Sequence, residues 1–114
     1  MARILLADDD DILVDLVRFR LEAAGHDLIV ATDGGAALAC ARAEQPDAII
    51  LDAMMPVMSG EDFLRHLREN PSFGPIPVII VTASGRQPLP GAQGILKKPF
   101  EIGDLFATVA AHCV

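Results

Sequence analysis

The chain has 114 residues, of which 52% are apolar, and it carries a formal net charge of −7. This length fits one domain over residues 1–114, and the acidic balance argues against binding to nucleic acid, which requires clustered Lys and Arg. No apolar run reaches the roughly 18–20 residues that cross a bilayer, and the first residues lack a signal-peptide layout, so we expect a cytoplasmic chain without a membrane contact.

Strand and helix patterns alternate along the chain, which is typical of an α/β domain with a parallel sheet. Short apolar runs predict strands buried on both faces at residues 4–7, 28–31, 48–51, 78–81 and 94–97. Helical spacing of apolar residues predicts four helices in the intervals: from about residue 12 to 24, at 36–43, from 59 to about 70, and from 102 to 113.

The first predicted helix has clear signals at both ends. Asp10 and Asp11 are expected to cap its start near Ile12, and Gly25 supplies its stop. Its apolar side chains are expected to face the core: Leu13, Leu16, Val17, Leu21 and Ala24.

The next two helices also show cap signals. Asp33 is the expected N-cap of the second helix, which must end before Pro46. Ser59 and Asp62 resemble a capping box for the third. In the third helix we expect Phe63, Leu64 and Leu67 to point inward, with Arg65 and Arg68 outward.

The eleven residues 83–93 interrupt the alternation. A parallel crossover usually needs a dozen or more residues including its helix. This segment contains two Gly and two Pro residues, which are poor in a helix interior. A further helix would be expected here, fourth in chain order and between the last two strands. It is therefore predicted to be shortened or absent.

Polar side chains follow four of the predicted strands. They are Asp8 and Asp9, Asp52, Thr82 and Lys98. The carboxyl ends of parallel strands meet at one edge of the sheet, where open α/β sheets place their ligands. Carboxylates, a hydroxyl and an ammonium group at one edge suit a divalent cation and a phosphoryl group. Mg²⁺ prefers one or two carboxylates among its oxygen ligands, which Asp9 and Asp52 can supply, while Asp8 accepts from a bound water.

Four sequence pieces in this order resemble the receiver domain of two-component response regulators (the CheY-like family): ILLADDD, DAMMPVMSG, VTA and KPF, at residues 4–10, 52–60, 81–83 and 98–100. The resemblance implies a flavodoxin-like, doubly wound, five-stranded parallel sheet of order 2-1-3-4-5. It also implies Mg²⁺ or Mn²⁺ as the cofactor, with the backbone carbonyl of Met54 as a further ligand.

The resemblance implies a phosphoacceptor function for the chain. Asp52 would attack a phosphohistidine of a sensor histidine kinase or a histidine phosphotransfer protein, giving an acyl phosphate. Lys98 would pair with the phosphoryl charge, and Thr82 would donate a hydrogen bond to a phosphoryl oxygen. The domain would catalyse its own phosphorylation and dephosphorylation, and would signal by a conformational change.

Two other functions compete with this interpretation. A receiver-like fold can serve as a protein-interaction module without phosphorylation, although the matched acidic, Thr and Lys positions are intact. An aspartate-nucleophile hydrolase of the haloacid-dehalogenase type would place a second Asp two residues after the nucleophile. Here that residue is Met54.

Overall fold

The computed structural model describes residues 3–52, 60–69, 76–82, 94–97, 103–104 and 107–108. Five parallel strands form one sheet in the order β2-β1-β3-β4-β5. The strands are β1 (Arg3–Ala7), β2 (Asp27–Ala31), β3 (Ala48–Asp52), β4 (Val78–Thr82) and β5 (Gly94–Lys97). The predicted doubly wound sheet and its strand order are therefore confirmed.

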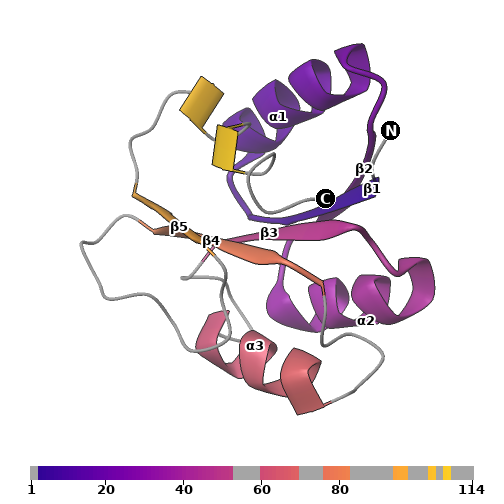
Figure 1. The fold of residues 1–114 in the computed structure, drawn as a ribbon, viewed down its shortest axis with the longest axis vertical. Helices are drawn as coiled ribbons and strands as arrows, with labels where there is room; N and C mark the ends of the chain where they lie inside the picture. Colours follow the sequence, from indigo (N-terminus) through magenta and orange to yellow (C-terminus); the bar gives the residue numbers. More distant parts are fainter. Residues whose placement is uncertain are drawn as a thin grey trace.

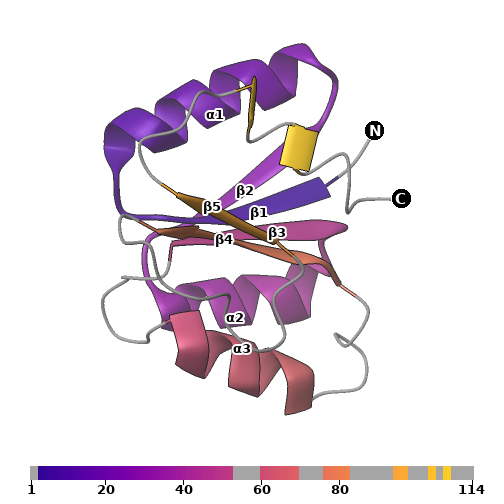
Figure 2. The same ribbon diagram turned by 60° about the vertical axis from the view of Figure 1, so that its left-hand side comes forward.

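The sheet lies between two layers of helices. Helix α1 (Asp11–Ala23) covers one face, and α2 (Gly34–Glu44) and α3 (Gly60–Glu69) cover the other (Figures 1 and 2). Residues 103–104 and 107–108 are helical, as expected for the last helix. The expected shortening of the fourth helix concerns residues 83–93, which lie outside the described residues. No helix in the described part of the chain combines the length and apolar character needed to cross a membrane.

Alternate residues of the strands build two separate cores. Leu5 and Ile49 pack with the side chains of α2 and α3, among them Phe63. Their neighbours Leu6 and Ile50 pack on the opposite face with the side chains of α1. Because both faces of each central strand are buried, the strands appear in the sequence as uninterrupted apolar runs.

Helix α1 buries a narrower stripe than its sequence suggested. Val14, Val17 and Leu21 are its buried residues. The prediction that Leu16 and Ala24 face the core is wrong: both are exposed, Leu16 to 48%. Leu16 precedes Val17 by one residue and is therefore rotated from it by about 100° around the helix axis. Ala24 is the C-cap, at the point where the chain turns away.

Both ends of α1 carry the predicted caps. The side chain of Asp10 accepts from the backbone N–H groups of Ile12 and Leu13, and Asp11 is the first helical residue. At the other end, Gly25 adopts φ +86°. The N–H of Gly25 donates to the carbonyl of Glu22 at 3.0 Å. The N–H of His26 donates to the carbonyl of Leu21, also at 3.0 Å. This pair of bonds is the Schellman motif.

Helix α2 begins and ends with two other caps. Asp33 accepts from Ala36 N at 2.8 Å, which confirms it as the N-cap. The C-cap is Gln45 in the left-handed conformation, at φ 47° and ψ 64°. A glutamine has no glycine-like tolerance of this region, so the end of α2 is strained relative to the end of α1.

Helix α3 buries Phe63, Leu64 and Leu67, as predicted. Asp62 pairs with Arg65 at 3.2 Å on its exposed side, while Ser59 of the expected capping box lies outside the described residues. The expectation that Arg68 points away from the core is wrong. Its Nη1 donates to the carbonyl of Ile76 at 3.1 Å, and burial lowers the pKa of this guanidinium. The bond ties the end of α3 to the segment that enters β4.

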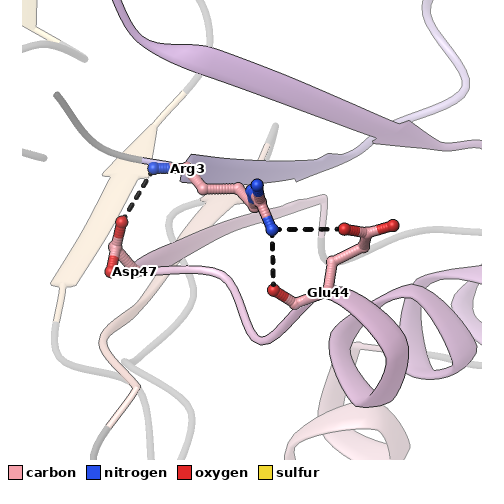
Figure 3. Close-up of polar contacts among 3 residues, drawn as sticks. All are labelled: Arg3, Glu44 and Asp47. Carbon is pink, nitrogen blue, oxygen red and sulfur yellow. Dashed lines mark hydrogen bonds and ion pairs between the residues drawn. The ribbon is translucent and has the colours of Figure 1, made fainter.

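Arg3 joins the start of β1 to the turn between α2 and β3 (Figure 3). Its backbone N–H donates to Asp47 Oδ2 at 2.8 Å, and Asp47 N donates back to the carbonyl of Arg3 at 2.7 Å. The guanidinium contacts both the backbone carbonyl and the carboxylate of Glu44, at 3.4 and 3.3 Å. The ion pair is half exposed and contributes little, so the two bonds with Asp47 are the ones that fix this turn.

The two helix ends give a stability prediction with opposite signs. Gln45→Gly should raise the free energy of unfolding by about 0.5–1 kcal/mol, because glycine adopts the left-handed conformation without strain. Gly25→Ala should lower it by about 1 kcal/mol; an added Cβ would contact nothing within 4 Å, so only backbone strain changes. Urea titrations check both, and a Gln45→Gly variant less stable than wild type would contradict the assignment.

Candidate functional site

The pairing of β1 with β3 brings two carboxylates together. Ile4 pairs with Ala48, and the register continues to Ala7 opposite Leu51. The next residues in this register are Asp8 and Asp52, at the carboxyl edge of the sheet. Both are buried, with 1% and 8% of their surface exposed. Asp52 is the last residue of β3 rather than the first residue after it, so the strand itself fixes its backbone.

Asp8 is held by hydrogen bonds to the residues around it. Its backbone N–H donates to the carbonyl of Ala31, at the end of β2, at 3.1 Å. Its Oδ1 accepts from the backbone N–H of Asp10 at 2.9 Å. Sequence reasoning predicted the capping role of Asp10 but missed this second bond. The spacing of two residues between an Asp side chain and the accepted N–H is the Asx-turn pattern, which was available in the sequence.

Asp9 completes a cluster of three carboxylates. One ligand atom from each of Asp8, Asp9 and Asp52 lies within 4.8 Å of the others. Asp9 is exposed, so the cluster opens to solvent on its side. Three hard oxygen donors at this separation fit Mg²⁺, whose charge would offset the mutual repulsion of the carboxylates.

Thr82 ends β4 beside this cluster and is buried. Asp52 pairs with Val81, and Thr82 pairs with Lys97 in the neighbouring β5. The strands thus bring Thr82 to the same edge as Asp8 and Asp52. Lys98 follows Lys97 in the sequence, but it and Met54 lie outside the described residues.

Comparisons with known proteins assign the chain to one family. The family model for the response regulator receiver domain matches residues 4–110. The chain belongs to this family. It is a receiver domain of the response regulators of two-component systems, and receiver domains take phosphoryl groups from histidine kinases.

Relatives of this receiver domain differ in how much of their length it covers. It is 35% identical to protein PilH of Pseudomonas aeruginosa, over 97% of both chains. It is 40% identical to the DNA-binding dual master transcriptional regulator RpaA of Synechocystis, over 97% of this chain but 48% of RpaA. It is 42% identical to the response regulator PleD of Caulobacter vibrioides, of which it spans 25%.

Solved receiver structures share the fold over almost the whole chain. The chemotaxis protein CheY4 of Vibrio cholerae has a TM-score of 0.88 at 32% identity, over 98% of both chains. The receiver domain of the sensor histidine kinase PA1611 from Pseudomonas aeruginosa has a TM-score of 0.90 at 25% identity, over 98% of this chain and 97% of that one. That structure has a magnesium ion coordinated in its active site cleft.

The crowding of carboxylates predicts that this receiver domain is destabilised at its own site. Asp8→Asn removes one charge but keeps an oxygen that can accept from Asp10, so in excess chelator it should raise the free energy of unfolding by about 1 kcal/mol or more. Saturating Mg²⁺ should narrow this difference in the free energy of unfolding between the variant and the wild type. The wild type, with its full set of carboxylates, gains more stability by mass action when its folded state binds the cation.

Thermal unfolding with and without Mg²⁺ measures both effects. Asp27→Asn is the matched control, since Asp27 is an exposed residue at the start of β2, opposite Arg3 in the strand register and at the other edge of the sheet from the cluster. An Asp8→Asn variant that unfolds at a lower temperature than the wild type in excess chelator would contradict the electrostatic account.

Proposed function

We propose that this receiver domain accepts a phosphoryl group on Asp52 from a phosphohistidine, in a reaction that requires Mg²⁺. The observation that supports this most directly is the group of three carboxylates within 4.8 Å at the carboxyl edge of the sheet. The donor would be a sensor histidine kinase or a histidine phosphotransfer protein. Residues 1–114 would form the single receiver domain that carries the reaction.

Asp52 is the carboxylate best suited to act as the nucleophile. It is held at the end of β3 and is buried, which favours in-line attack from one fixed direction. A carboxylate oxygen would form the new P–O bond while the P–N bond to the donor imidazole breaks, and the imidazole retains its electron pair and takes up a proton. The transfer produces an acyl phosphate.

The other site residues would hold the reacting groups. Bound Mg²⁺ would neutralise charge on the carboxylates and on the phosphoryl oxygens. Asp9 and Asp52 would be its direct carboxylate ligands, Asp8 would accept from a bound water, and the carbonyl of Met54 would complete the protein's share. Thr82 would donate its hydroxyl to a phosphoryl oxygen, and Lys98 would pair with the phosphoryl charge. Mn²⁺ suits the same oxygen ligands.

Asp52→Asn should abolish phosphorylation by acetyl phosphate, because an amide oxygen is a much weaker nucleophile than a carboxylate oxygen. The wild-type protein should gain the mass of one phosphoryl group in the presence of Mg²⁺ and none in excess chelator. Intact-mass spectrometry after incubation with the donor measures both.

Asp27→Asn is again the control, and it should be phosphorylated like the wild type. Phosphorylation that persists in Asp52→Asn would overturn the assignment of the nucleophile. A wild-type protein that neither binds Mg²⁺ nor gains the phosphoryl mass would favour the phosphorylation-independent interaction module instead.

The surface of α1 beside the site suits a protein donor. Ile12 and Phe19 are 81% and 72% exposed, and with Leu16 they lie at i, i+4 and i+7 on one side of the helix. They are the exposed large hydrophobic residues within the described part of the chain. The row starts with Ile12 in the first turn of α1, three residues after Asp9. Exposed apolar side chains in a row mark a contact surface, and we propose that the phosphohistidine-bearing partner covers it.

Leu16→Ser should slow phosphoryl transfer from a phosphorylated histidine kinase by about tenfold, since burying a Leu side chain contributes roughly 1.5–3 kcal/mol to such a contact. Phosphorylation by acetyl phosphate should be unchanged, because that donor needs no docking surface. The comparison of the two rates in one protein separates docking from chemistry.

Glu69→Ser, at the exposed end of α3, is the control and should leave both rates at the wild-type value. If Leu16→Ser slows phosphoryl transfer equally from the kinase and from acetyl phosphate, the substitution has damaged the site rather than removed a docking contact.

A further inference from the structure

We propose that Asp10 is a positioning residue for the cation site: by capping α1 it holds the N–H group that orients the carboxylate of Asp8. The inference rests on the proposed Mg²⁺-dependent function and adds a residue whose side chain is outside the ligand set. It makes the affinity for the cation depend on the integrity of the first turn of α1.

A backbone N–H group from the start of α1 helps to orient the carboxylate of Asp8. Oδ1 of Asp8 accepts from Asp10 N at 2.9 Å, and the backbone of Asp8 is anchored to Ala31. Because this side chain is buried, losing a hydrogen-bond donor to it costs free energy that bulk water does not restore. If Asp10 N moves, the carboxylate of Asp8 loses this bond, and the geometry of the three carboxylates changes with it.

The position of Asp10 N is fixed in turn by helix α1. Asp10 has an extended backbone, at φ −83° and ψ 103°. Its Oδ1 accepts from Ile12 N at 3.0 Å and from Leu13 N at 3.3 Å, and its carbonyl accepts from Val14 N at 2.9 Å. These bonds hold Asp10 in the conformation that directs its own N–H toward Asp8. Removing the cap frees Asp10 to leave that conformation.

Charge alone gives a competing account, because Asp10 is also an exposed carboxylate close to the cluster. Two substitutions separate charge from capping. Asp10→Asn removes the charge and keeps the cap, since Asn caps helices as well as Asp does. Asp10→Glu keeps the charge, but its extra methylene group moves the carboxylate away from the N–H groups of Ile12 and Leu13.

The two variants are compared by calorimetric titration of the whole chain with MgCl₂; the chain contains no Trp or Tyr to report by fluorescence. Positioning predicts that Asp10→Glu binds Mg²⁺ about tenfold more weakly than Asp10→Asn, the lower end of the range for changes behind a metal ligand. Charge alone predicts the opposite order. Asp11→Asn, which removes the neighbouring charge from the first helical residue, should match Asp10→Asn.

Amide hydrogen exchange on the wild-type protein tests the same link without any substitution. Because coupling between two sites is reciprocal, saturating Mg²⁺ should slow exchange at Ile12 and Leu13. Exchange at Ala36, capped by Asp33 in the same manner on α2, should change less. Unchanged exchange at Ile12 and Leu13, or equal affinities of Asp10→Glu and Asp10→Asn, would overturn the inference. A wild-type protein that binds no Mg²⁺ would instead overturn the proposed function.

Discussion

The register of β1 on β3 is the constraint on which the rest of the structure depends. Each residue of β1 lies opposite the residue 44 positions later in the chain, from Ile4 with Ala48 to Ala7 with Leu51. The same offset joins Arg3 to Asp47 at one edge of the sheet and brings Asp8 beside Asp52 at the other. A slip by one residue would separate the two buried carboxylates. It would also turn every side chain of the strand to the wrong core, which is why the register is so strongly specified.

The two edges of this strand pair have opposite electrostatic character. At the amino edge, the backbone of Arg3 exchanges two short hydrogen bonds with Asp47, and the guanidinium of Arg3 pairs with the carboxylate of Glu44. At the carboxyl edge, three carboxylates crowd together. The apolar rows between the edges supply the burial that tolerates this repulsion, since each strand is covered on both faces. Stability is therefore concentrated in the middle of the sheet and at its amino edge, which leaves the carboxyl edge available for a ligand.

Local signals in the sequence predicted much of this fold. Asp10, Asp33 and Gly25 lie at helix ends as expected because capping depends on a few adjacent residues. The strand order could not be obtained from the strands, because every strand covered on both faces has the same apolar appearance. It came from the resemblance carried by the motifs. The convergence of Asp8, Asp9 and Asp52 did follow from the strands, because the carboxyl ends of parallel strands meet at one edge of the sheet.

The failures concern features that depend on more than one element. Leu16 fits a helical apolar pattern as well as Val14 does, and only the position of the sheet decides which of them is buried. Arg68 carries a charge that suggests solvent, yet the carbonyl of Ile76 needs a donor, and a long side chain can reach it. Neither the exposure of Leu16 nor the hydrogen bond of Arg68 follows from the residues of one helix. Both depend on how that helix packs against its neighbours.

The four consecutive aspartates at residues 8–11 show how position along the chain separates identical side chains. Asp8 continues the register of β1 and is buried, while Asp9 faces solvent at the same cluster. Asp10 turns the chain into α1, and Asp11 stands in the first turn, where the helix dipole favours a negative charge. Strand, carboxylate cluster, cap and helix thus follow each other with no linker between them. Asp10 alone therefore separates the carboxylates of Asp8 and Asp9 from the first turn of α1, in which the exposed row begins at Ile12.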